Sequence, residues 1–354
     1  MAAAVRSDLL RQVGLRSATA LVVANIVGAG IFTTTGFQAA DLGHAGLIYL
    51  VWIVGGVLAL SGALCYGELG AAMPDAGGEY VYLRETYGRP LAFMSAFVSL
   101  VAGFSAPVAA ALKSLVRYLT HFFPSLQPDE PWILGLSEGD TLAVVLVWTL
   151  VLIHGAGVRG GLAVSDWLTL LKVVGIALFV IVALALGKGT IAGLTSATPV
   201  FDTVRAEGAL APAIATSLVF VMFCYSGWNA AAYMAGEMKT PERDLPRSLL
   251  YGTGLVVLLY LGLNATYLYA VGLEGIEGEV EVGLIAARGL FGGLGVTLVA
   301  SVISVSILAS ASAMTIAGPR VYYAFGRDYE PMRWLAALGG RGGPPMLLWC
   351  CRGW

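Results

Sequence analysis

Charged residues are scarce in this chain. Only 12% of its 354 residues are Asp, Glu, Lys or Arg, whereas 58% are hydrophobic. An ordinary soluble domain carries about 25% charged residues. The net charge of −2 comes without a basic stripe, so the sequence predicts no nucleic-acid partner. The composition instead predicts an all-α polytopic membrane protein whose main surroundings are the lipid bilayer.

Residues that hold metals or carry acid–base chemistry are also rare. The chain has four cysteines and three histidines, and their spacing fits neither a disulfide framework nor a zinc site. No Ser/His/Asp arrangement is present, and the Gly-Lys-Gly-Thr stretch at 187–190 lacks the upstream glycine of a phosphate-binding loop. The sequence therefore predicts no cofactor, no metal and no enzyme activity.

Long stretches without charge are what the chain does have. A membrane-spanning helix needs about 20 apolar residues, and eight windows approach or exceed that length. They lie at residues 17–40, 47–66, 91–111, 141–158, 167–186, 211–235, 249–273 and 294–319. We treat residues 1–354 as one transmembrane domain with eight spans. Residues 320–354 are expected to form a cytoplasmic segment and the truncated start of a ninth helix.

The distribution of Lys and Arg predicts the orientation of these spans. With the N-terminus in the cytoplasm, 14 of the 20 basic residues fall on the cytoplasmic side and 5 on the outside, and Lys172 lies within the fifth window. Cytoplasmic loops carry the excess of basic residues in membrane proteins. We therefore expect a multi-pass protein of the inner or plasma membrane with a cytoplasmic N-terminus.

The first window contains Gly28 and Gly30, separated by a single alanine. Two glycines so close together weaken a helix and favour unwinding. Unwound backbone at membrane depth is tolerated where it lines a cavity or is buried in protein. The alternative is that the glycines only permit close helix packing.

The sixth window carries a second candidate break at residues 223–229, where Ser226 and Gly227 adjoin Trp228 and Asn229. Interrupted helices at corresponding positions of two repeats indicate a transporter's binding site. Helix N-termini at such breaks can bind a carboxylate, and freed carbonyls can bind an ammonium group. A zwitterion matches both requirements.

Lys172 is the one charged residue within a span. An ammonium group there costs about 2.5–3.5 kcal/mol on insertion scales. It lies near the end of its window, so snorkelling to the interface is the alternative to a functional role. A functional lysine offers either a fixed positive charge in place of Na⁺ or a proton carrier. Hydroxyls of the eighth window are candidate partners, although most such hydroxyls bond to their own helix.

The sixth window leads into a charged connector that begins at Glu237 and includes Arg243. With Pro241 and Pro246 it reads as a stiff cytoplasmic loop. A gate is the alternative interpretation.

These stretches resemble the amino acid–polyamine–organocation transporter superfamily, and in particular its L-type amino acid transporter branch. Residues 28–32, Gly-Ala-Gly-Ile-Phe, match the family's G-[SA]-G-I-F motif. Further matches lie at residues 66–69, 74–80, 87–88, 225–247 and 320–327. The resemblance implies an inverted-repeat fold of five plus five helices, in which helices one and six are broken.

The resemblance also implies a ligand site. The amino acid carboxylate would bind the N–H groups of Ala29 and Gly30, and its amino group would bind carbonyls near Ile26 and Phe223, with Phe223 as a gating aromatic. The full implied set is Ile26, Gly28, Ala29, Gly30, Ile31, Phe223, Tyr225, Ser226, Gly227, Trp228 and Asn229. Lys172 resembles the family's fifth-helix lysine, which replaces a sodium ion beside an eighth-helix serine, here Ser310 or Ser312.

Two departures from the family pattern concern this site. Ala29 stands where a serine is common, and Ser226 stands where the L-type branch has glycine. Against the family pattern we also expect that the later helices are absent from residues 1–354 and that the second repeat is incomplete.

The function expected is secondary transport of neutral amino acids by alternating access, through rocking of spans one, two, six and seven. One rival is a non-transporting truncated remnant of such a permease. The other is a channel or membrane-embedded enzyme, which would need charges or a catalytic polar cluster within the spans. A partner subunit, the coupling mode and the amino acid carried are left open.

Overall fold

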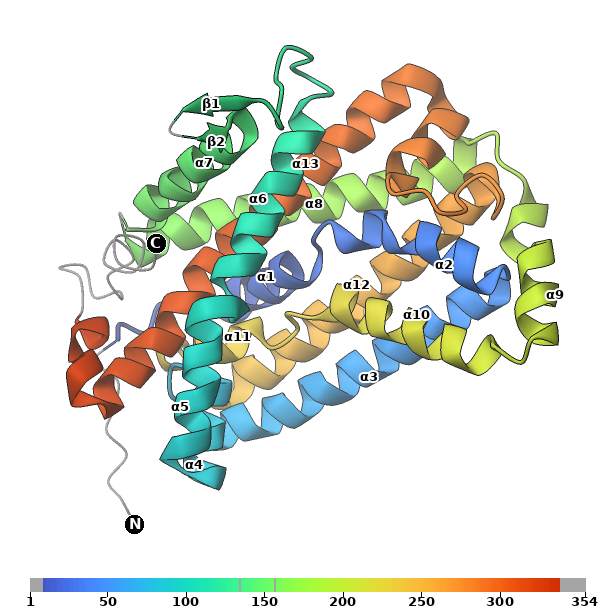
Figure 1. The fold of residues 1–354 in the computed structure, drawn as a ribbon. Coiled ribbons are helices and arrows are strands. Elements are labelled where there is room, and N and C mark those ends of the chain that lie inside the picture. Colours follow the sequence, from blue (N-terminus) through green and yellow to red (C-terminus); the bar gives the residue numbers. More distant parts are fainter. Residues whose placement is uncertain (1–8, 134, 156, 338–354) are drawn as a thin grey trace.

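The computed structural model describes residues 9–133, 135–155 and 157–337. The expected start of a ninth helix lies outside these residues. The described chain forms a bundle of α-helices, with one two-stranded antiparallel hairpin at its edge (Figure 1). The α-helices are α1 (Leu15–Ile26), α2 (Thr34–Leu42), α3 (Ala45–Ala72), α4 (Glu79–Tyr87), α5 (Arg89–Val98), α6 (Ser105–Leu119), α7 (Glu138–Gly155), α8 (Val158–Leu186), α9 (Pro199–Ala206), α10 (Leu210–Tyr225), α11 (Ala230–Tyr233), α12 (Pro241–Val271) and α13 (Val282–Asp328).

Shorter elements connect these helices. The 3₁₀ helices are η1 (Gly30–Phe32), η3 (Ile191–Thr195), η4 (Ala235–Glu237) and η5 (Glu330–Ala336). A π-helical turn, η2 (Ser99–Gly103), joins α5 to α6. The hairpin strands are β1 (Pro131–Ile133) and β2 (Leu136–Ser137).

Six helices among the described residues, with α5, η2 and α6 counted as one, are long and apolar enough to cross a membrane. They coincide with six of the eight predicted windows, namely those on α3, α5–α6, α7, α8, α12 and α13. The other two windows are the first, which covers α1, η1 and α2, and the sixth, which covers α10 and α11. The chain is thus a multi-pass membrane protein, whereas the number of crossings and the inverted repeat stay predictions.

Several boundaries differ from the sequence-based expectation. α12 begins at Pro241, so the charged stretch expected as a loop forms its first two turns. Proline is well placed there, because the first helical position needs no N–H donor. α13 continues to Asp328 past the expected end at residue 319, and Gly292 interrupts it with a positive φ of 66°.

The outward face of α8 is apolar. Leu170, Leu171, Val174, Leu178 and Ile181 are each at least half exposed. An apolar surface of this extent suits the hydrocarbon region of a bilayer.

Close helix approaches occur at small residues. α12 packs against both α3 and α1. A Cβ at Gly252 of α12 would lie 2.7 Å from the Val22 side chain of α1. Small interface residues of this kind let helices pack tightly where lipid gives no hydrophobic drive. The contact holds the first broken helix in the centre of the bundle, where Figure 1 shows α1.

Candidate functional site

The first predicted break is present. α1 ends at Ile26, and Val27 adopts φ −79° and ψ 91°, outside the helical region. Helical structure resumes with η1 at Gly30, in which Ile31 is buried, and with α2 at Thr34. Within the described part of the chain, the Ala29 N–H donates no backbone hydrogen bond. The donor that the break leaves without a backbone partner is therefore the N–H of Ala29, which has a glycine on each side.

Lys172 is fully buried on α8 and reaches the same break. Its Nζ donates to the Val27 carbonyl at 2.6 Å and to the Ala24 carbonyl at 3.0 Å. Both acceptors lie where α1 loses its regular hydrogen bonding. The snorkelling alternative is wrong for this structure, because the ammonium group points into the protein and replaces bonds that the break leaves open.

The two serines expected beside this lysine lie in different surroundings. A Cβ at Gly28 would lie 3.9 Å from the Ser310 hydroxyl, so Ser310 faces the first break. Ser312 Oγ instead lies 2.9 Å from His154 Nε2 of α7. Of the two, Ser310 is the one placed near the break that Lys172 contacts.

The second predicted break is also present. α10 ends at Tyr225, Ser226 is extended with ψ 151°, and α11 begins at Ala230. Gly227 has a positive φ of 96°, and a Cβ there would lie 3.1 Å from Asn25 backbone atoms. Glycine is favoured at this position for both reasons, since its backbone conformation and its contact with α1 disfavour a side chain.

The two breaks touch each other. A Cβ at Gly30 would lie 2.8 Å from Cys224 Sγ, and the Thr34 hydroxyl lies 3.2 Å from the same sulfur. The Tyr260 hydroxyl of α12 lies 2.9 Å from the Ile26 carbonyl and 3.0 Å from the Cys224 carbonyl. A residue that the sequence analysis missed therefore joins the two unwound segments, because a tyrosine in an apolar helix carries no local signal of such a role.

The carbonyls expected to bind an ammonium group are already satisfied in this conformation. Ile26 O accepts from Gly28 N at 3.0 Å as well as from Tyr260. Phe223 O accepts from the backbone N of Ser226 at 3.1 Å and from its hydroxyl at 2.6 Å. A carbonyl has two lone pairs, so a ligand at either oxygen must displace one of these donors.

The side chains of the second break point in several directions. Phe223 is 74% exposed, and Ser226 is exposed beside it. Tyr225 is buried and donates to the Trp52 carbonyl at 3.3 Å. These residues are adjacent in the sequence, but their side chains do not share one ligand-facing surface. A gating role for Phe223 stays a prediction.

Trp228 and Asn229 make protein contacts on the side of α3 and α4. Trp228 packs edge-on against Tyr66 with ring centroids 4.8 Å apart. The Asn229 amide donates to Glu79 at 3.1 Å and lies 2.9 Å from the Tyr233 hydroxyl. These contacts fasten α11 to the neighbouring helices.

A buried ion pair joins η4, which follows the second break and α11, to α13. Arg320 Nε donates to Glu237 Oε1 at 2.8 Å, and both side chains are 1% exposed. The backbone carbonyl of Glu237 also accepts from Gln12 and Val13 at 2.8 and 2.9 Å. Arg243, the other expected gate residue, is exposed on the first turn of α12. Of the two expected gate residues, Glu237 therefore takes part in a buried ion pair, and Arg243 lies at the surface.

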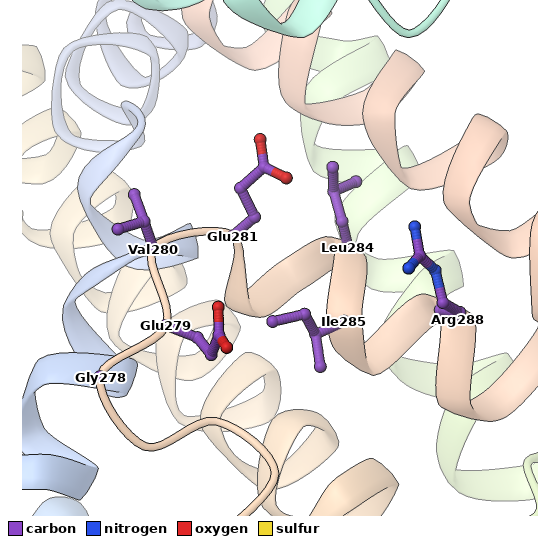
Figure 2. A pocket seen from close by; sticks show the side chains of 7 residues that line it. All are labelled: Gly278, Glu279, Val280, Glu281, Leu284, Ile285 and Arg288. Atoms are coloured by element: carbon purple, nitrogen blue, oxygen red, sulfur yellow. The ribbon is translucent and has the colours of Figure 1, made fainter.

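A hollow of about 390 Å³ lies in the loop between α12 and α13 (Figure 2). Residues 278–281 and the side chains of Leu284, Ile285 and Arg288 line it. It includes none of the residues expected to bind the ligand. Among the described residues, no three His, Cys, Asp or Glu side chains are grouped to hold a metal ion.

Comparison with known proteins adds a family. Residues 13–352 match the family model described as amino acid permease. The chain is 31% identical over 321 residues to the serine/threonine exchanger SteT of Bacillus subtilis, covering 90% of this chain and 68% of that protein. It is 27% identical over 322 residues to the large neutral amino acids transporter small subunit 2 of Mus musculus, covering 90% and 59%. A b(0,+)-type amino acid transporter 1 of Homo sapiens is 30% identical over 265 residues, covering 74% and 52%.

Proposed function

Because the chain belongs to the amino acid permease family, we propose that it is a secondary transporter that moves neutral amino acids across the membrane. The relatives are named as transporters and exchangers of amino acids, and none is named as an enzyme. The chain spans 68%, 59% and 52% of the lengths of the three relatives described above. The activity, substrate and partners of the whole protein are therefore part of the proposal.

The observation that carries the proposal is the contact between two broken helices. The segments around Gly28 and Gly227 lie against one another, and the Ala29 N–H is a donor without a backbone partner among the residues that the structure describes. A carboxylate fits that donor, since helix N-termini and free backbone N–H groups at such breaks favour anions. The amino group would take carbonyls of the same breaks once Tyr260 or Ser226 releases them.

We further propose that Lys172 supplies a fixed cation next to this site. Its ammonium group donates to the carbonyls of Ala24 and Val27. These oxygens would otherwise suit Na⁺, because hard cations prefer oxygen ligands. We assign it the role of a sodium substitute, with Ser310 beside the break as a second polar group.

Transport would proceed by alternating access in the inner or plasma membrane, with the N-terminus in the cytoplasm. Glu237 and Arg320 would then form part of the closed inner gate, because their pair and the Gln12–Val13 contact bridge the N-terminal segment, η4 and α13.

Uptake into proteoliposomes tests the proposal. Purified chain would be reconstituted and supplied with labelled serine, leucine and lysine, with and without internal unlabelled amino acid. We expect saturable uptake of the neutral amino acids that greatly exceeds uptake of lysine. Equal leak of all three, or uptake that unlabelled serine and leucine fail to compete, would overturn it.

A further inference from the structure

Glu79 joins the connection between α3 and α5 to the second broken helix. It is the first residue of α4 and is partly buried. Its carboxyl group accepts a hydrogen bond from Asn229 at 3.1 Å, and the Tyr233 hydroxyl is its second partner. Asn229 and Tyr233 border α11, which follows the second break. The carboxyl group thus holds the segment that carries the break.

The backbone around Glu79 is fastened to the same segment. Gly77 N–H donates to the Tyr233 carbonyl at 3.2 Å. A Cβ at Gly78, where φ is +54°, would lie 2.7 Å from the Tyr233 ring. Residues 77–79 therefore dock closely on residues 229–233, and the carboxyl group lies at the centre of the contact.

The groups that face this carboxyl are hydroxyls and an amide. Tyr66 of α3, Tyr82 of α4 and Tyr233 of α11 are the titratable neighbours. Within the described part of the chain, no Lys or Arg forms an ion pair with Glu79; Arg84 of α4 pairs with Glu85 and Asp328, and Arg320 pairs with Glu237. A negative charge at Glu79 therefore has dipoles but no cation to balance it.

A neutral carboxylic acid fits this environment as well as a carboxylate does. An ionised carboxylate only accepts hydrogen bonds, whereas the acid has one O–H donor and a carbonyl acceptor. Asn229 can donate to that carbonyl, and the Tyr233 hydroxyl can accept the acid proton. The neutral form keeps both contacts and avoids the cost of a partly desolvated charge.

We propose that Glu79 is a proton-binding site, whose protonated form keeps residues 229–233 docked on α4 and whose ionised form favours their separation. The inference rests on the proposed function in one respect, namely that separation of these elements opens the ligand site. By the count of basic residues, the opening faces the cytoplasm.

The direction of the pH effect follows from the burial of the Glu79 carboxyl. Desolvation raises the pKa of the Glu79 carboxyl above its ordinary value, against the lowering effect of its bonds from Tyr233 and Asn229 and of the helix N-terminus. Separation from α11 would return the carboxyl to water and to its ordinary pKa. The docked arrangement is therefore fully favoured below the ordinary pKa, and it loses stability as pH rises through the raised one.

Hydrogen–deuterium exchange of the full chain in lipid nanodiscs tests this. Exchange would be followed by mass spectrometry from about pH 4 to about pH 8, which begins near the unperturbed glutamate pKa of roughly 4.3, and corrected for intrinsic rates. We expect the protection of amides in residues 229–238 to fall as pH rises, by up to about tenfold per pH unit. Glu79→Gln should remove this dependence, and Glu85→Gln on the exposed side of α4 should keep it.

Two outcomes would overturn the proposed proton site. One is wild-type protection that does not change with pH, and the other is protection in Glu79→Gln that still changes with pH. Should Glu79→Gln fail to fold, Tyr233→Phe keeps the carboxyl and removes a donor to its ionised form. Its midpoint should move to higher pH, and an unmoved midpoint would also contradict the proposal. Exchange needs no transport, so a chain with this profile that fails to take up amino acids would overturn the proposed function and leave the proton site in place.

Discussion

At the scale of single residues, Lys172 and the small residues of the breaks determine the local geometry. The lysine was identified in the sequence because a charge in an apolar window is rare. Its partners could not be predicted from spacing, because Ala24 and Val27 are about 145 residues away and contribute only backbone oxygens. Tertiary packing alone brings them together.

Replacing Lys172 with methionine should remove two charge-assisted hydrogen bonds and keep the volume of the side chain. Each such bond contributes about 1.5–3 kcal/mol, so we expect substrate uptake to fall by at least about tenfold. Lys188→Met is the matched control, since Lys188 is exposed. Proteoliposome uptake measures both. Equal uptake by the Lys172 variant and wild type would remove the lysine from the mechanism.

Gly30→Ala should strain the contact between the breaks, because the added Cβ would lie 2.8 Å from Cys224 Sγ. Overpacking of this kind costs about 1–3 kcal/mol. The double variant with Cys224→Ala should recover much of the loss, which a double-mutant cycle of thermal unfolding midpoints would detect. Gly14→Ala, with no atom within 4 Å of its Cβ, is the control. An additive cycle would show that the two residues do not meet.

At the scale of elements, the interrupted helices were the most predictable feature. Gly28 and Gly30, and later Ser226 and Gly227, are poor helix formers within windows otherwise long enough to span a membrane. The structure has a break at each pair. The short α9, the β1–β2 hairpin and the helical start of α12 are not predicted from the sequence, because they lie between the charge-free windows from which the helices are predicted.

Tyr260 couples the two broken helices through α12, and its hydroxyl is the feature to test. Tyr260→Phe should remove a donor from the Cys224 carbonyl, at a cost of about 1–3 kcal/mol for a buried unsatisfied group, whereas the Ile26 carbonyl keeps its bond from Gly28 N. We expect a lower thermal midpoint and altered affinity for the amino acid, because both carbonyls lie at the breaks. The matched control is Tyr251→Phe, because Tyr251 lies on the same helix and is 55% exposed. It should change neither the thermal midpoint nor the affinity. A wild-type midpoint for Tyr260→Phe would contradict the bridge.

At the scale of the whole molecule, the bundle encloses polar contacts that join distant parts of the chain. The pair of Glu237 and Arg320 links residues 83 positions apart. The sequence analysis placed Arg320 among the cytoplasmic charges, because a basic residue after an apolar window is usually solvated. Its burial depends on the continuation of α13, which the sequence window did not reveal.

Glu237→Gln should leave the Arg320 guanidinium buried without its counter-charge. Breaking a buried pair by removal of one partner costs about 3–5 kcal/mol, so the thermal midpoint should fall clearly. The matched control, Glu85→Gln, breaks the exposed pair with Arg84 and should cost about 1 kcal/mol or less. Similar midpoints for the two variants would show that the buried pair does not hold the inner side together.

Binding of a labelled neutral amino acid to the purified chain tests the central claim most directly. The comparison is between wild type, Ala29→Phe, which places a bulky side chain on the residue whose N–H is expected to bind the carboxylate, and Val174→Phe, which enlarges the exposed face of α8. We predict saturable binding by wild type and Val174→Phe, and loss of at least about tenfold in affinity, or about 1.4 kcal/mol, for Ala29→Phe. Undiminished binding by a folded Ala29→Phe protein, or the absence of binding by wild type, would contradict a ligand site at the broken helices.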